Sequence, residues 1–268
     1  MQKKLTVWLK SMLTILIIGL TVSTTYATDT QIRLGYSDEE AFPFQIRHDA
    51  NPPGIAMEII NQVAKDIGIE IIYLQLPNKR VLRSLLKGDV IDGAFMYSFK
   101  TERETNGKYP MKDGKLDEEK RLTTLTYYIY KLKKSLLKWD GNKFSGVEFN
   151  DMNMRIGANM GYSIVGDLQK MGIEVDEGAK KTDQNFKKLL NGRIVGYAHQ
   201  DLVADNYLKT NRINVVEKIS IPLSTKPYFL MFSHQFIKQN PQMAEKIWTR
   251  IAEIRDTVTK EVVHKYSK

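Results

Sequence analysis

The order of apolar segments is the same in two halves of the chain, and this repetition constrains the fold more than any other feature. In each half, short apolar runs typical of strands alternate with stretches whose apolar residues fall on one helical face. Such alternation predicts parallel sheets covered by helices. The strands are predicted at residues 32–36, 69–74, 90–96, 155–158, 173–175 and 194–198, and the helices at 55–67, 81–86, 163–170 and 183–190.

The segments outside these two units predict how the units are joined. Residues 123–130 are aromatic and β-branched, and 215–221 and 228–233 are also predicted to be extended. A helix with Pro241 in its first turn follows, and its wide apolar face needs a partner, which we expect to be the first unit. The predicted fold class is α/β, with two open-sheet lobes joined by a two-strand hinge around a cleft. The predicted domains are a first lobe at 28–129, a second lobe at 130–225 and a return to the first lobe at 226–268.

The first residues have the pattern of a secretory signal peptide. Lys3, Lys4 and Lys10 precede an apolar run at 11–20, which is too short to span a bilayer, and a small residue, Ala27, ends the polar stretch that follows. We expect cleavage after Ala27; an uncleaved anchor helix is the alternative. Because the chain has no cysteine that could carry a lipid, the predicted location is the periplasm.

Composition excludes several functional classes. With 42% hydrophobic and 26% charged residues, the 268-residue chain resembles an ordinary globular protein, and its lack of cysteine removes thiol catalysis and thiolate metal sites. The net charge is +9, but three of the lysines lie in the predicted leader and the rest are spread out, so nucleic-acid binding is not expected. The four histidines are far apart and no glycine-rich phosphate loop is present, so we expect neither a metal nor a cofactor.

Polar residues follow the first and third predicted strands of each unit, where ligands bind in open α/β sheets. Asp38 and Arg103 hold these places in the first unit. Ser163 and Asp201 hold them in the second. Arginine and a helix N-terminus bind a carboxylate, and the two aspartates would accept an ammonium group, so together they predict a receptor for a zwitterion. Taken singly, an Asx turn or N-cap explains Asp38 or Ser163 equally well, and a surface ion pair explains Arg103.

These motifs resemble, in their order along nearly the whole mature chain, the family-3 extracellular solute-binding proteins. The members of this family are periplasmic receptors for polar amino acids with the type II periplasmic-binding fold. The resemblance implies the two-lobe fold and closure of the lobes around a ligand. It is carried by Leu34-Gly35, Asp38, Pro43-Phe44, the helix at 54–67, the segments 85–93, 98–103 and 157–163, and the stretch 191–201.

The resemblance also implies the roles of individual residues. Arg103 would bind the ligand's α-carboxylate, helped by Ser98 and by Ser163 with the backbone amides around Gly161. The segment before Arg103 is one residue shorter than the family pattern, so Tyr97 could take the place assigned to Ser98.

On the opposite side of the ligand, the resemblance assigns the α-ammonium group to two carboxylates. Asp201 would receive this group together with Asp38. Buried ionic groups of this kind bind strongly only when every one of them is paired.

The chain departs from the family in the region of the ligand's side chain. Ala41 stands where an aromatic residue often covers the ligand, and Phe42 or Phe44 could compensate. Arg80 would add positive charge and favour an acidic side chain or a second carboxylate; a surface arginine is the alternative. The charged segment 104–121 is longer than expected, and would be a rim, a lid or a solvated loop.

We therefore expect a monomeric periplasmic protein that captures an amino acid or a similar small molecule and presents it to an ABC permease. The first alternative is a sensing role in which closure reports the ligand to a membrane receptor. The second is an enzyme on the same scaffold, resembling relatives that dehydrate cyclic acids. Its general acid would be Glu39, Glu40 or His199.

Overall fold

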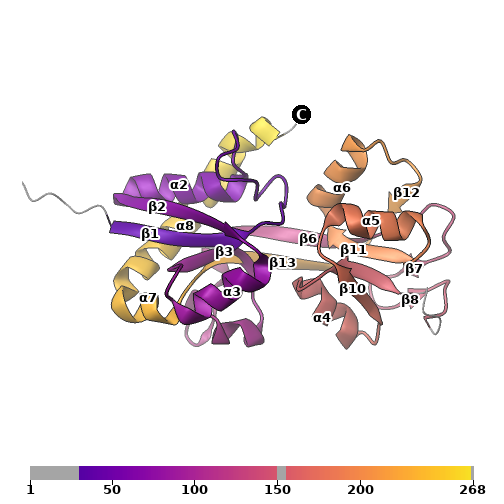
Figure 1. The fold of residues 1–268 in the computed structure, drawn as a ribbon, viewed down its shortest axis with the longest axis horizontal. Helices are drawn as coiled ribbons and strands as arrows, with labels where there is room; N and C mark the ends of the chain where they lie inside the picture. The colour runs from indigo at the N-terminus through magenta and orange to yellow at the C-terminus, as the bar shows by residue number, and fades with distance from the viewer. Residues whose placement is uncertain (1–29, 150–154, 267–268) are drawn as a thin grey trace, which may run out of the picture.

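The two predicted α/β units are present as two lobes joined by long strands (Figure 1). The computed structural model describes residues 30–149 and 155–266, so the predicted signal peptide lies outside the described residues. One sheet runs through both lobes in the order β10-β9-β11-β6-β13-β3-β1-β2, and β12 pairs with β6. Among the described helices, none is both long enough and apolar enough to cross a membrane.

The first lobe has the predicted β-α-β-α-β order. Strand β1 pairs in parallel with both β2 and β3. The apolar face of α2 is buried, and this helix ends at Gly68, whose left-handed conformation closes its last turn through a bond to Ala64. The elements are β1 (Thr30–Ser37), α2 (Ile55–Ile67), β2 (Ile69–Leu76), α3 (Asn78–Lys87) and β3 (Gly93–Ser98).

The second lobe repeats the same order, with β9 between β10 and β11. Two of its strands begin later than predicted because the preceding residues still belong to helix ends. The amide of Ile173 bonds back to Leu168, and that of Arg193 bonds back to Lys188. The elements are β9 (Ile156–Asn159), α4 (Ser163–Lys170), β10 (Val175–Ala179), α5 (Thr182–Leu190), β11 (Gly196–Gln200) and α6 (Asp201–Thr210).

The predicted two-strand hinge is confirmed. Strands β6 (Thr123–Leu132) and β13 (Ser224–Phe232) are antiparallel to each other and run between the lobes (Figure 1). On one side β13 pairs with β3, and on the other side β6 pairs with β11 and with β12 (Val216–Lys218). The two strands therefore place their middle residues between the lobes.

The C-terminal helix returns to the first lobe, as its apolar face predicts. Helix α7 (His234–Gln239) leads into α8 (Pro241–Val262), which packs on α2, and the short turn η3 (Val263–Tyr266) follows. The end of the segment 104–121 lies against α8, where Lys120 bonds to Glu245 at 2.5 Å, and Leu116 and Glu118 line an open pocket together with Asp167 and Met171 of the second lobe. The remaining short elements are η1 (Thr101–Thr105), β4 (Met111–Lys112), β5 (Lys115–Leu116), η2 (Glu118–Lys120), β7 (Lys138–Trp139) and β8 (Phe144–Ser145).

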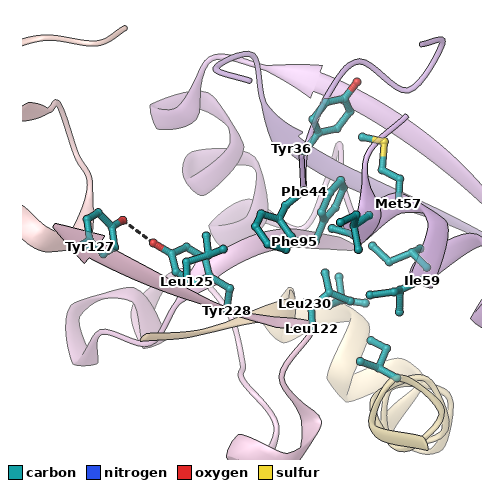
Figure 2. Close-up of a cluster of buried hydrophobic side chains, with 14 of the residues drawn as sticks. Tyr36, Phe44, Met57, Ile59, Phe95, Leu122, Leu125, Tyr127, Tyr228 and Leu230 are labelled. Carbon is teal, nitrogen blue, oxygen red and sulfur yellow. Dashed lines mark hydrogen bonds between the residues drawn. The ribbon is translucent and has the colours of Figure 1, made fainter. Parts of the chain in front are cut away.

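The core of the first lobe extends to the hinge. Figure 2 shows Phe44, Phe95 and Leu230 packed together, with the pair Tyr127 and Tyr228 at the edge of the cluster. Burying such a side chain contributes about 1.5–3 kcal/mol relative to leaving it exposed. The hinge strands are therefore anchored by the same apolar contacts that hold the lobe together.

Candidate functional site

A cavity of about 50 Å³ lies between the lobes. Its walls come from the loop after β1, from the end of β3, from the start of α4 and from the two hinge strands. Each of these segments follows or belongs to a strand of the central sheet, which is where the topology of open α/β sheets places ligands. The residues that line it include Glu39, Tyr97, Arg103, Gly161, Ser163 and Gln200.

Arg103 is the central charged residue of this cavity. Its side chain is 8% exposed, and the turn η1 folds it back so that Nη1 donates to the carbonyl and hydroxyl oxygens of Ser98 at 2.8 and 3.3 Å. Nη2 reaches the other lobe and donates to the carbonyl of Gly161 at 3.2 Å. The guanidinium carbon lies 5.4 Å from the centre of the Tyr97 ring. No carboxylate among the described residues forms an ion pair with Arg103, so this buried charge is free to receive an anion.

A β-bulge at the end of β3 sets the direction of the residues before Arg103. The register with β13 shifts between Phe229 and Leu230, and Met96 has a positive φ of 65°. An extra residue in one strand bends it and re-aims the side chains that follow, which is a frequent arrangement beside binding sites. As a result both Tyr97 and Ser98 line the cavity, and the hydroxyl of Tyr97 donates to Asn78 at 2.7 Å.

The second lobe contributes the turn that begins α4. Gly161 has a φ of +78°, and a Cβ there would lie 3.3 Å from the amide nitrogen of Asn78 in the opposite lobe. Glycine therefore allows both the turn and the close approach of the lobes. Ser163, the first residue of α4, is buried, and no side chain caps this helix start. The backbone amides there and the helix dipole favour an anion next to Arg103.

A lysine on the hinge supports this serine. The Lys226 ammonium group donates to Ser163 Oγ at 3.1 Å and forms an ion pair with Asp167 on α4. Burial lowers the pKa of Lys226, although Asp167 acts in the opposite direction. Because Lys226 donates to the serine oxygen, the hydroxyl proton of Ser163 remains available for a hydrogen bond to another acceptor.

Two hinge tyrosines and Gln200 form a buried polar network on the floor of the cavity. The hydroxyls of Tyr127 and Tyr228 are 2.5 Å apart (Figure 2), and Gln200 Nε2 donates to both at 3.1 Å. Gln200 is 4% exposed, and its Oε1 has no hydrogen-bond partner in the described structure. An unpaired buried carbonyl costs about 1–3 kcal/mol, so a hydrogen-bond donor on a bound ligand would be favoured at this oxygen.

Glu39 is a second unpaired acceptor that faces the cavity. Its backbone carbonyl accepts from Gln45 at 2.9 Å and its amide donates to Ser37 at 3.1 Å, which fixes the loop after β1. Its Oε2 is buried without a partner. Burial, followed by the nearby charge of Asp38, raises the pKa of Glu39 to about 7. Glu39 is the carboxylate of the cavity lining, as Arg103 is its permanent cation.

Five of the nine residues predicted from the sequence come together here: Tyr97, Ser98, Arg103, Gly161 and Ser163. The structure does not distinguish Tyr97 from Ser98, since both line the cavity. Glu39 and Gln200 line the cavity in place of the predicted aspartates. Glu39 directly follows Asp38 in the chain, and Gln200 directly precedes Asp201.

The other four predicted residues lie outside the cavity lining. Asp38 is exposed, and Asp201 accepts from the amide of Leu202 at 2.8 Å at the start of α6. Phe42 packs edge-on against Tyr266, with ring centres 6.1 Å apart, and Arg80 is exposed on α3. Strand alternation gives a sequence signal for Gln200, the last residue of β11, but none for Glu39, which lies in the loop after β1.

The described residues contain no group of three or more acidic or histidine side chains arranged to hold a metal ion. The cavity instead carries a guanidinium, a carboxyl group, amide and hydroxyl groups and several aromatic rings. Groups of these types bind a small polar ligand through its charges and exclude water around it.

The fold is that of solute-binding proteins with two lobes. The chain superposes on the GluR0 ligand-binding core from Nostoc punctiforme in complex with L-glutamate with a TM-score of 0.65 at 15% identity, over 88% of this chain and 99% of the other. An ancestral arginine-binding protein bound to glutamine gives 0.63 at 20% identity, over 88% and 97%. An ABC uptake transporter substrate-binding protein from Streptococcus pneumoniae with bound histidine gives 0.64 at 18% identity, over 88% and 92%.

These structures confirm the type II periplasmic-binding fold that the sequence resemblance implied. No family model matches the chain, and no curated protein matches it by sequence. At identities of this size the likeness establishes the fold, whereas function depends on the chemistry of the cavity itself.

Proposed function

We propose that this protein captures an amino acid or an amino-acid-like molecule in the interlobe cavity and delivers it to an ABC-type importer. The observation that carries the proposal is the buried guanidinium of Arg103, which lies between two hinged lobes without a carboxylate partner among the residues described. A buried charge is costly unless it is paired, and a ligand carboxylate would supply the missing partner.

The contacts around Arg103 support capture by closure. Arg103 belongs to the first lobe, and its bond to Gly161 brings it to the start of α4 in the second. A carboxylate held by Arg103, Ser163 and the first amides of α4 would touch both lobes at once. A ligand that binds the closed form better than the open form shifts the population toward closure. The solute-binding proteins with the same fold are described as bound to glutamine or histidine.

The first test is thermal unfolding of the purified protein with single compounds. The panel contains L-alanine, L-glutamate, L-glutamine, L-histidine, L-lysine and L-arginine, with glucose and spermidine as compounds that lack a carboxylate. A ligand at one hundred times its Kd stabilises the folded state by about 2.7 kcal/mol, which corresponds to a rise in Tm of about 5–10 °C for a chain of this size. We expect at least one amino acid, and neither control compound, to raise the Tm. A rise with glucose or spermidine alone would contradict the proposal.

The transport step has its own test, because sensing would use the same cavity. We expect cells that lack this protein to lose uptake of the radiolabelled amino acid that raises the Tm, and to regain it with the wild-type gene. Unchanged uptake together with intact binding would favour the sensing alternative. In both cases the proposed location is the periplasm and the proposed state is a monomer.

An enzyme is the second candidate, and one observation favours it. The carboxyl group of Glu39 faces the cavity with a pKa raised to about 7 by burial, as a general acid requires. The other two candidate acids are less suitable, since Glu40 is exposed and His199 is buried outside the cavity lining, bonded to Thr182 at 2.9 Å. Burial also lowers the pKa of His199 to about 3. Recovery of a bound acid chemically unchanged, checked by mass spectrometry, separates binding from catalysis.

A further inference from the structure

We propose that Glu39, together with the side-chain carbonyl of Gln200, receives the ammonium group of the ligand and restricts the ligand to compounds that carry N–H donors. This inference rests on the proposed function above and adds the residue that sets specificity. It departs from the sequence resemblance, which assigned the ammonium group to Asp201 and Asp38.

The two acceptors come from opposite lobes and share one cavity. Glu39 Oε2 is buried without a partner, and so is Gln200 Oε1. Gln45 holds the backbone of Glu39, and the paired hydroxyls of Tyr127 and Tyr228 hold the amide nitrogen of Gln200. The backbone of Glu39 and the side-chain amide of Gln200 are thus held by bonds that leave both oxygens unused. Buried acceptors are almost always hydrogen-bonded, so their donor must come from the ligand or from water that the ligand replaces.

The chemistry of these acceptors identifies the kind of cation. A primary ammonium group has three N–H donors, enough for both oxygens, whereas a quaternary ammonium group has none. The aromatic rings of the cavity would attract either cation, but a quaternary group would leave Glu39 and Gln200 unpaired. A deaminated acid would bind Arg103 and leave both acceptors without a donor.

The positive and negative ends of the cavity are separate. Arg103 and Glu39 both line it, yet they form no ion pair in the described structure, and Arg103 is bonded to Ser98 and Gly161 instead. A zwitterion would place its carboxylate at Arg103 and its ammonium group at Glu39. Each buried charge would then be paired, as strong binding of ionic groups requires.

Several charged groups face Glu39 and determine how it titrates. Burial is the largest influence on its pKa, Asp38 raises the pKa further, and Lys180 and Lys181 of the second lobe lower it. The pKa is about 7, so the carboxyl group is half protonated near neutrality. An ammonium ligand needs the ionised form. Its affinity should therefore fall about tenfold between pH 8 and pH 6, and binding should release protons.

The experiment is isothermal titration calorimetry of the full chain at pH 6 and pH 8. The probes are L-alanine and L-glutamate, their 2-hydroxy analogues L-lactate and 2-hydroxyglutarate, and alanine betaine, in which the nitrogen carries three methyl groups. The variants are Glu39→Gln, Asp201→Asn and, as a matched control on an exposed glutamate of the second lobe, Glu177→Gln. Circular dichroism of each variant confirms that it is folded.

We expect wild type and Glu177→Gln to bind the amino acid about tenfold more weakly at pH 6 than at pH 8, and to bind the hydroxy acids and the betaine poorly at both. Glu39→Gln should weaken amino-acid binding at pH 8 by about 30-fold or more and remove the pH dependence. Amino-acid binding unchanged by Glu39→Gln, or lost in Asp201→Asn alone, would overturn the inference and leave the proposed function standing. If the hydroxy acids bind as tightly as the amino acids, recognition of the ammonium group is also overturned. If neither these probes nor any other amino acid of the thermal-unfolding panel binds, the proposed function itself is overturned.

Discussion

Replacing Arg103 by methionine should abolish the rise in Tm that an amino acid gives to the wild-type protein. Methionine fills much of the same space but cannot donate to a carboxylate or to the carbonyl of Gly161 in the opposite lobe. Removing one partner of a buried charge pair costs about 2–5 kcal/mol, which is a loss in affinity of about 30-fold to several thousandfold. The ligand's carboxylate would otherwise be buried beside Ser163 without its counter-ion.

The Tm of the ligand-free variant gives a second, opposite expectation. In the described structure Arg103 is a buried cation that no carboxylate pairs, so its removal should leave the ligand-free Tm unchanged or raise it. A loss of ligand-induced stabilisation without a loss of basal stability would separate a binding role from a structural role.

Two further variants sharpen this measurement. Arg103→Lys keeps the charge but not the planar fork that binds a carboxylate through two bonds, so it should restore only part of the affinity. Arg83→Met removes an exposed arginine from α3 and serves as the control. An amino acid that still raises the Tm of Arg103→Met by the wild-type amount would show that the anion is bound elsewhere.

The fold could be predicted from the sequence because its signals are local and periodic. The helices at 55–67 and 163–170 have the predicted ends, and the hinge strand β6 includes the predicted segment 123–130. Other boundaries differ by a few residues: the helix predicted at 81–86 begins at Asn78, and β10 begins late because Gly172, with φ of +76°, lets the chain continue the helix end by hydrogen bonds before the strand begins. Apolar runs alone do not show where a helix end gives way to a strand.

The site could be predicted only in part, because one residue's shift at a strand end changes which side chain enters the cavity. Gln200 is the last residue of β11 and faces the cavity, whereas Asp201 begins α6 and bonds to its own first turn. Likewise Glu39 faces inward and Asp38 outward, because Gln45 fixes the loop between them and the following segment. These directions depend on hydrogen bonds that no sequence motif shows.

The sequence pattern also does not predict which segments far apart in the chain contact each other. Tyr127 and Tyr228 are 101 residues apart and meet because β6 and β13 are paired strands of the hinge. The same pairing places Lys226 beside Ser163. The polar floor of the cavity is thus a product of the hinge topology, so residues of the hinge both connect the lobes and form part of the site.

The largest effect on stability is expected for Trp248→Ala in the returning helix α8. Trp248 is 6% exposed, its ring centre lies 5.3 Å from that of Phe232, and its Nε1 donates to the carbonyl of Leu230 at 2.7 Å. Both partners belong to the hinge strand β13, so this side chain joins α8 to the hinge. Truncation removes the apolar contact, leaves a cavity and deprives a buried carbonyl of a donor, which together cost about 3–5 kcal/mol.

Urea unfolding followed by circular dichroism measures this loss, and two substitutions divide it into its parts. Trp248→Phe keeps an aromatic ring and removes the N–H donor, so its cost should be about 1–3 kcal/mol and smaller than that of alanine. Leu136→Ala alters a side chain that is 72% exposed, and should change stability by less than about 0.5 kcal/mol. Equal stability of Trp248→Ala and Leu136→Ala would show that α8 does not anchor the hinge. Because the hinge strands carry Tyr127, Lys226 and Tyr228 into the cavity, we also expect Trp248→Ala to weaken ligand binding at temperatures where the protein is still folded.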